Sequence, residues 1–177
     1  MTERLQSPML GVLFVCMANI CRSPTAEAMF ASKARKAGIV DSLTVDSAGT
    51  HDYRVGAPPD LRAQDAAFKR GYDLSAKRAR LVNREDLAVN HYILAMDIKN
   101  LTVLHRLGEP DLWQKPKLMM SFSRLYQSKE VPDPYVGGEE GFELVLDMLE
   151  SATDGLLSVV KKDLQQRTTT GWPEVRP

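Results

Sequence analysis

A cysteine and an arginine six positions apart, Cys16 and Arg22, are the residues of this chain best suited to do chemistry. A thiolate is a strong nucleophile, and a guanidinium presents paired donors to two oxygens of a phosphoryl group. The apolar run 10–15 is typical of a buried strand, and residues 24–37 show helical spacing. A loop between a strand and a helix directs backbone N–H groups and the helix dipole at one point. That field would hold a phosphate and favour the thiolate of Cys16.

Other residues of this loop are expected to support it. Asn19 tolerates the left-handed backbone that a chain wrapped around an anion often needs. Ser23 can donate a hydrogen bond to the Cys16 sulfur or cap the following helix. Cys21 can form a reversible disulfide with Cys16, which makes it a redox candidate, or simply pack in the core. The remaining positions expected to line a bound phosphate are Met17, Ala18 and Ile20.

The rest of the chain predicts a single α/β domain that positions this loop. Strands are predicted at 43–45, 92–96 and 117–120, and helices at 60–70, after Asn83, from Asp97 to Gly108 and at 142–165. This alternation indicates a four-stranded parallel sheet with helices on both faces and the phosphate-binding loop after its first strand. Ligands of such sheets lie beyond the carboxyl ends of the strands. Four polar residues follow the four strands in turn and are expected to meet there: Cys16, Ser47, Asp97 and Asp133.

Length and composition limit the number of domains, the partners and the cofactors that can be expected. A chain of 177 residues is expected to form one domain at 9–166, with a flexible lead-in at 1–8 and a disordered polar tail at 167–177. Because 23 basic residues balance 23 acidic ones, nucleic acid and membrane partners are not expected. We expect a soluble, cytoplasmic protein, since no apolar stretch approaches the length of a membrane span. Two cysteines and three histidines give no zinc-site spacing, so neither a metal nor another cofactor is expected.

The segment from Val15 to Glu27, with further matches to about Phe142, resembles the low-molecular-weight protein tyrosine phosphatases. The resemblance implies that Cys16 attacks phosphorus to give a cysteinyl phosphate, while Arg22 stabilises the transition state. Asp133, in the motif Asp133-Pro134-Tyr135, would then be the general acid and base. From the residues alone, an aspartate between prolines is usually only a turn residue. The family also implies that Asn19 and Ser47 hold the loop.

Tyr53 and Tyr135 are expected to flank the pocket mouth and stack on a substrate ring. A pocket of that depth favours phosphotyrosine over the shorter phosphoserine. The expected partners are phosphotyrosine-containing proteins or peptides, with phosphate and other oxyanions as inhibitors. The chain departs from the family pattern at Lys77, where many relatives carry a histidine, and at Val136, which replaces a second tyrosine.

Three other functions fit parts of the pattern. Arsenate reductases share the fold and loop but need further cysteines downstream, and this chain has none after Cys21. Protein arginine phosphatases tend to carry threonine where Ile20 stands, and an apolar residue there favours an aromatic phosphoester. A phosphate-binding module without turnover is disfavoured by the intact set of Cys16, Arg22 and Asp133.

Overall fold

The computed structural model describes residues 9–170 of the chain, and a parallel β-sheet lies at its centre. Its strands β1 (Leu10–Cys16), β2 (Leu43–Gly49), β3 (Tyr92–Ala95) and β4 (Pro116–Leu118) pair in the order β2-β1-β3-β4. Every pairing is parallel, as the sequence predicts. All seven residues of β1 are buried, because this strand has a neighbour on each side and helices above and below.

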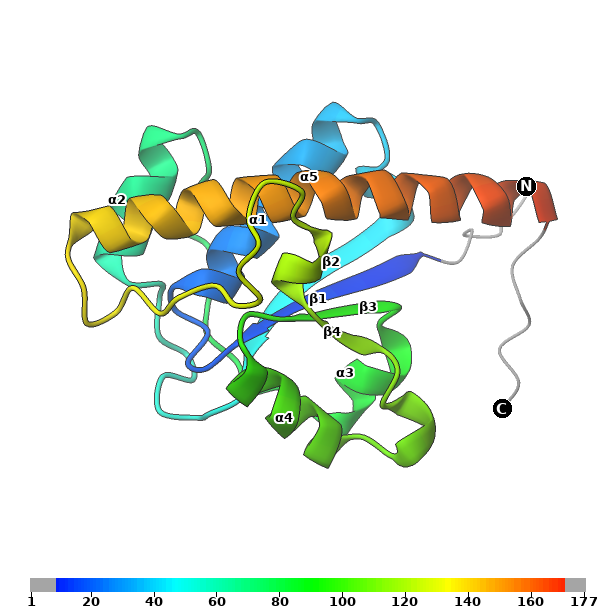
Figure 1. Cartoon of the computed structure of the whole chain (residues 1–177), viewed down its shortest axis with the longest axis horizontal. Helices are drawn as coiled ribbons and strands as arrows, with labels where there is room; N and C mark the ends of the chain where they lie inside the picture. The colour runs from blue at the N-terminus through cyan, green and yellow to red at the C-terminus, as the bar shows by residue number, and fades with distance from the viewer. Residues whose placement is uncertain (1–8, 171–177) are drawn as a thin grey trace, which may run out of the picture.

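Helices cover both faces of the sheet, also as predicted (Figure 1). Alternate residues of β1 divide between two apolar cores, as the two-residue period of a strand requires. Leu10, Val12 and Phe14 pack with α1, α2 and α5, whereas Leu13 and Val15 pack with residues of α3 and α4. The bounds of the helices are Arg22–Lys36 for α1, Leu61–Lys69 for α2, Arg84–Val89 for α3, Ile98–Leu107 for α4 and Glu139–Thr170 for α5.

The strand order creates a topological switch beside β1. The chain passes from β1 to β2 on one side, and then to β3 and β4 on the other. Connections at such a point diverge and leave a crevice at the carboxyl ends of the strands. The loop 17–21 leaves β1 at this end of the sheet, and α4 begins at the same end (Figure 1).

Two predicted boundaries near the loop are wrong. Helix α1 begins at Arg22, with Cys21 at the N-cap position and no side-chain cap, so Ser23 lies inside the first turn and does not cap it. Strand β2 continues to Gly49, so Ser47 lies within the strand and not after it. The strand is longer because its backbone pairs with β1 over the full length of both, from Leu10 opposite Leu43 to Cys16 opposite Gly49.

The fourth strand is also shorter than predicted. Met119 and Met120 are buried in a 3-10 helix, η3 (Met119–Phe122), and do not continue β4. Helix α5 packs directly on this turn, and a Cβ placed on Gly155 would come within 1.9 Å of the Phe122 carbonyl oxygen. The side chains of Met119 and Met120 therefore enter the core from a turn. A short buried apolar run in a sequence does not show whether its backbone is a strand or a turn.

Helix α5 extends beyond the boundary predicted at residue 167, so residues 167–170 are helical and not disordered. An ion pair of 2.7 Å between Arg167 and Asp163, four residues apart, supports this last turn. The lead-in predicted at 1–8 and residues 171–177 of the predicted tail lie outside the described residues. Within residues 9–170, no helix is long and apolar enough to cross a membrane.

Candidate active site

Cys16, the last residue of β1, lies at the base of a cavity of about 260 Å³. Its side chain is only 3% exposed, and its Sγ lies 3.0 Å from the Ser23 hydroxyl oxygen. The predicted pocket residues Tyr53, Asp133 and Tyr135 line the same cavity, although they come from two distant loops. The sulfur therefore faces a pocket with charged and aromatic walls. The other lining residues are Met17, Ala18, Ile20, Cys21, Arg22 and Arg54.

The backbone of the loop after β1 is arranged to receive an anion. Asn19 has φ 56°, and it is the sole non-glycine residue with positive φ in the described part of the chain, in agreement with the prediction. Within residues 9–170, no protein acceptor is found for the backbone N–H groups of residues 18–22. These N–H groups, at the N-terminus of α1, remain available to bind phosphoryl oxygens. The loop carbonyls are instead occupied by the chain after β2: Cys16 accepts from Thr50, Met17 from His51 and Ile20 from Asp60.

Gly49, at the end of β2, allows this close approach, and its role was not predicted. A Cβ at Gly49 would lie 2.8 Å from the Met17 carbonyl oxygen and 3.1 Å from the Ala18 carbonyl carbon. Any side chain there would push the loop away from β2. The Ser-Ala-Gly-Thr run at 47–50 is thus a supporting wall of the loop as well as the end of a strand.

Arg22 crosses the base of the pocket and is 2% exposed. One terminal nitrogen, Nη1, donates to Asp97 Oδ2 at 2.7 Å and to the Val131 carbonyl at 3.1 Å, and the other, Nη2, donates to Asp133 Oδ2 at 2.9 Å. Burial opposes the charged form, but the negative charges of Cys16, Asp133 and Asp97 raise the pKa of Arg22. The guanidinium therefore stays charged beside the sulfur.

Asp97 is a site residue that the sequence placed correctly without giving it a function. It is the N-cap of α4, where its Oδ1 accepts from the Asn100 amide at 2.7 Å. Its other oxygen binds Arg22, so one carboxylate both starts a helix and orients the guanidinium. An Asx residue directly after a buried strand and before a helix was the available signal.

Asn19, Ser23 and Ser47 come together beneath the loop. The Asn19 side-chain nitrogen donates to the hydroxyl oxygens of Ser23 and Ser47, each at 2.9 Å. Ser47 donates in turn to Glu27 at 2.7 Å. Glu27 is thus a buried partner of both Ser47 and Lys77.

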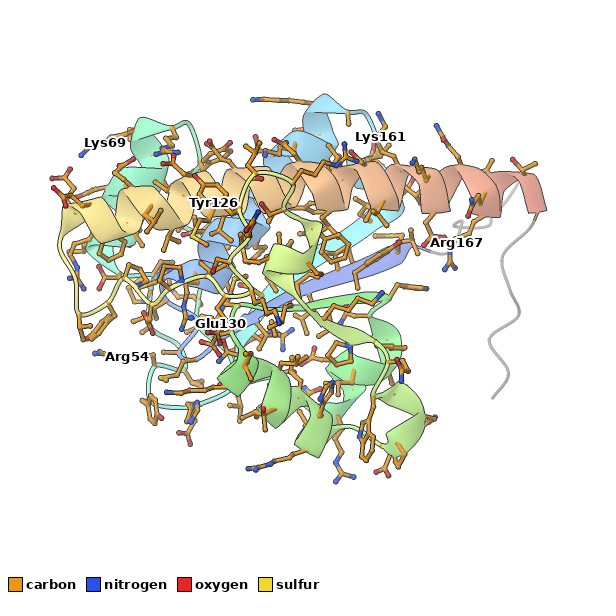
Figure 2. All side chains as sticks on the ribbon, viewed as in Figure 1. Arg54, Lys69, Tyr126, Glu130, Lys161 and Arg167 are labelled. Atoms are coloured by element: carbon orange, nitrogen blue, oxygen red, sulfur yellow. The ribbon has the colours of Figure 1, made fainter. Side chains whose placement is uncertain are left out.

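The pocket mouth is formed by the loops after β2 and before α5. Arg54, labelled in Figure 2 at the end of the sheet where α4 begins, donates from Nη2 to the Tyr135 hydroxyl at 2.9 Å. The ring of Tyr53 stacks on His51 with centroids 5.0 Å apart. Val136 is 93% exposed and does not line the cavity, so the departure at this position leaves the inner walls unchanged.

Cys21 is the second thiol of the loop, and it differs from Cys16 in its surroundings. Burial, followed by the negative charge of Asp60, strongly raises the pKa of Cys21. It is therefore a neutral thiol near pH 7 and a poor nucleophile. Both cysteines are free and line the same cavity.

The fold and this loop define a class, that of α/β proteins with a buried cysteine at the start of a loop, after the first strand, whose backbone N–H groups are available to an anion. Comparison with known proteins narrows the class. Residues 11–166 match the family model described as low molecular weight phosphotyrosine protein phosphatase. The chain belongs to this family.

Individual relatives of this family align with the chain over almost their whole lengths. A putative low-molecular-weight protein-tyrosine-phosphatase of Synechocystis is 42% identical over 88% of this chain and 99% of its own. Among solved structures, a protein tyrosine phosphatase of Entamoeba histolytica gives a TM-score of 0.84 at 36% identity, covering 88% of this chain and 99% of that one. The crystal structure of YfkJ from Bacillus subtilis also gives a TM-score of 0.84, at 33% identity over 89% of this chain and 98% of that one.

Proposed function

We propose that this chain is a protein-tyrosine phosphatase that hydrolyses phosphotyrosine in proteins or peptides through a cysteinyl-phosphate intermediate. One observation carries the proposal: the Cys16 sulfur, the Arg22 guanidinium and the Asp133 carboxyl line one cavity, beside a row of unengaged backbone amides. The Synechocystis and B. subtilis relatives are named as protein-tyrosine phosphatases, which supports the same activity.

In the first step, the phosphoryl oxygens bind the loop amides and Arg22, where they replace Asp133 on Nη2. A phosphate dianion beside Asp133 favours its protonated form, as a general acid requires. The Cys16 thiolate attacks phosphorus and forms the S–P bond while the P–O bond to the tyrosine ring breaks. Asp133 gives its proton to the leaving phenolate oxygen. Arg22 and the amides stabilise the charge on the remaining phosphoryl oxygens.

In the second step, water attacks phosphorus on the cysteinyl phosphate. Asp133, now ionised, accepts a proton from this water, and the S–P bond breaks to release phosphate. The electron pair returns to the Cys16 sulfur. A hydrogen bond from the Ser23 hydroxyl, 3.0 Å away, would ease the departure of this thiolate.

The walls of the pocket support an aromatic phosphoester as substrate. Tyr53 and Tyr135 stand on the rim, and Ile20 places an apolar side chain in the lining. A flat ring is held well between such groups, whereas a short phosphoserine would not reach from the rim to Cys16. Ile20 also favours this substrate over the more polar phosphoarginine. Free phosphate and similar oxyanions would compete for the loop as inhibitors.

We also propose that residues 9–166 form the catalytic domain and that the protein acts in the cytoplasm. A reducing compartment suits a chemistry that needs a free thiolate at Cys16.

Cys21 is proposed as a redox partner that protects Cys16 from overoxidation through a reversible disulfide. If it does, peroxide treatment followed by thiol should restore less activity to Cys21→Ser than to the parent. Equal recovery would reject this role.

The test of the main proposal compares three peptides of one sequence that carry phosphotyrosine, phosphoserine or phosphoarginine. We expect phosphotyrosine to have the highest kcat/KM and Cys16→Ser to release no phosphate from any of them. Chelator treatment should leave the rate unchanged. A preference for phosphoarginine, or phosphate release by Cys16→Ser, would contradict the proposal.

A further inference from the structure

The segment 134–138, which follows Asp133 and leads into α5, has little burial of its own to hold it in place. Pro134 is buried, whereas the four residues after it are exposed. The hydrogen bonds within this part of the chain are local, from the Gly137 N–H to the Pro134 carbonyl and from the Tyr135 N–H to the Asp133 carboxylate. The position of the segment therefore depends on contacts from elsewhere in the molecule.

Arg62, in the first turn of α2, supplies these contacts. Its Nη2 donates to the Tyr135 carbonyl at 3.0 Å, and its Nη1 donates to the Gly137 carbonyl at 3.4 Å. In the described part of the chain, no other residue distant in sequence forms a hydrogen bond with the backbone of the segment 134–138. The guanidinium carbon also lies over two rings, 5.5 Å from the Tyr135 centroid and 4.9 Å from that of Phe142.

The guanidinium of Arg62 is itself held in one orientation by Asp60. Nε and Nη2 donate to the two carboxylate oxygens at 3.0 and 2.9 Å, which is the paired geometry that arginine forms with a carboxylate. Asp60 is the N-cap of α2, and its backbone N–H donates to the Ile20 carbonyl of the phosphate-binding loop at 2.8 Å. The hydrogen bonds from Arg62 keep the pKa of Asp60 below its usual value, so the carboxylate stays charged near neutral pH. Arg62 therefore reaches the segment 134–138 from a fixed base.

Tyr135 connects Arg62 to Asp133. The Tyr135 carbonyl accepts from Arg62, while the N–H of the same residue donates to Asp133 Oδ1 at 3.2 Å. The other carboxylate oxygen, Oδ2, accepts from Arg22 at 2.9 Å. When a phosphoryl group takes the place of Asp133 on Arg22, the bond from the Tyr135 N–H is the contact that remains to orient the carboxyl group.

The same bond favours one oxygen of Asp133 as the carrier of the proton. Oδ1 faces the N–H of Tyr135 and has to accept, so a proton taken up by the carboxyl group is favoured on Oδ2. Oδ2 is also the oxygen that Arg22 releases. A shift of the Tyr135 backbone would turn this O–H group away from the leaving oxygen of the substrate.

We propose that Arg62 is a positioning residue for the general acid: its bonds to the Tyr135 and Gly137 carbonyls fix the backbone that aims Asp133 Oδ2 at the leaving phenolate oxygen. This inference rests on the proposed function, because it takes Asp133 as the general acid. Arg62 is not among the residues that line the cavity, so it acts through Tyr135 and not on the substrate.

The experiment uses two variants of Arg62 and one matched control. Arg62→Met removes the guanidinium, and Arg62→Lys keeps the charge without the paired geometry. The control is Arg70→Met, because Arg70 follows α2 and pairs with Glu143 and Asp147 of α5 without contacting the segment 134–138. The measurements are kcat/KM for phenyl phosphate and for p-nitrophenyl phosphate, together with the thermal midpoint of each variant.

We expect Arg62→Met to lose about tenfold in kcat/KM for phenyl phosphate and less than about threefold for p-nitrophenyl phosphate, whose leaving group needs no proton. Arg62→Lys should stay within about threefold of Arg62→Met, because one ammonium cannot replace the fork on both carbonyls and on Asp60. Arg70→Met should match the parent with both esters. In an Asp133→Asn background, Arg62→Met should cause no further loss, because the group that it positions is already gone.

An equal loss with both esters, or a loss of the same size in the Asp133→Asn background, would overturn the proposal. So would a folded Arg62→Met with the parental kcat/KM for phenyl phosphate.

Amide hydrogen exchange of the segment 134–138 separates this inference from the proposed function. Exchange should be faster in Arg62→Met than in the parent and in Arg70→Met, and equal rates in all three would contradict the role of Arg62. If the parent hydrolyses neither ester, the proposed function fails, whereas the exchange comparison still decides whether Arg62 holds this segment.

Discussion

Asp97 offers the sharpest test of how the pocket is organised, because its two carboxylate oxygens have separate partners. Oδ2 accepts from Arg22 at 2.7 Å, and Oδ1 caps α4 through the Asn100 amide. Asparagine is as good an N-cap as aspartate, but it removes the charge that faces Arg22. Asp97→Asn therefore separates the catalytic role from the structural one, and Asp97→Ala removes both.

The expected losses follow from these two contacts. A hydrogen bond between charged groups contributes roughly 1.5–3 kcal/mol, equivalent to about 10- to 150-fold in rate. Asp97→Asn still offers a neutral acceptor to Arg22, so we expect kcat/KM to fall about tenfold. Asp97→Ala should lose about 100-fold and, in addition, about 1 kcal/mol of unfolding free energy from the lost cap.

The assay is kcat/KM for p-nitrophenyl phosphate beside urea unfolding of the same protein samples. The account predicts that Asp97→Asn loses activity at parental stability, and that only Asp97→Ala loses both. Parental kcat/KM in Asp97→Asn would refute the argument that this carboxylate orients the guanidinium. If both variants lose activity in proportion to their loss of unfolding free energy, Asp97 acts only as the N-cap of α4.

Three further outcomes are expected. Asp133→Asn should reduce turnover of phenyl phosphate far more than that of p-nitrophenyl phosphate, whose leaving group needs no proton; equal reductions would contradict the general-acid role. Because burial raises the pKa of Cys21, iodoacetamide at pH 7 should label Cys16 and spare Cys21 in peptide maps, and labelling of both at similar rates would be inconsistent with this difference. Gly155→Ala should lower the unfolding free energy by about 1–3 kcal/mol, since its Cβ would meet a carbonyl oxygen within 1.9 Å. Gly138→Ala, whose Cβ meets nothing within 4 Å, is the control and should unfold like the parent.

The loop around Cys16 could be predicted because its determinants are close together in the sequence. A buried strand, a five-residue loop and a helix start are enough to predict that Cys16 and Arg22 lie at one anion site. The left-handed backbone of Asn19 is likewise a local property of asparagine, and φ 56° agrees with it. The parallel pairing of the four strands also follows from the alternation of strands and helices and from general rules of connection.

Contacts between distant segments could not be predicted in the same way. Asp97 was expected at the right edge of the sheet, but its bond to Arg22 spans 75 positions of sequence. The contact between Glu27 and Lys77 spans 50 positions, and nothing in the sequence of the helix that holds Glu27 indicates a partner from another segment. Met119 and Met120 fit a strand pattern because their burial makes both positions apolar, whereas their backbone forms a turn against which α5 packs.

The central claim is that the phosphoryl group passes through the sulfur of Cys16. Acid quenching during turnover of an aryl phosphate, followed by mass spectrometry of the peptide that contains the 16–22 loop, measures this directly. The account predicts one phosphoryl group on Cys16 in the parent and none in Cys16→Ser, which should also be inactive. Phosphate release without any modified Cys16 peptide, or a phosphoryl group on another residue during turnover, would contradict it.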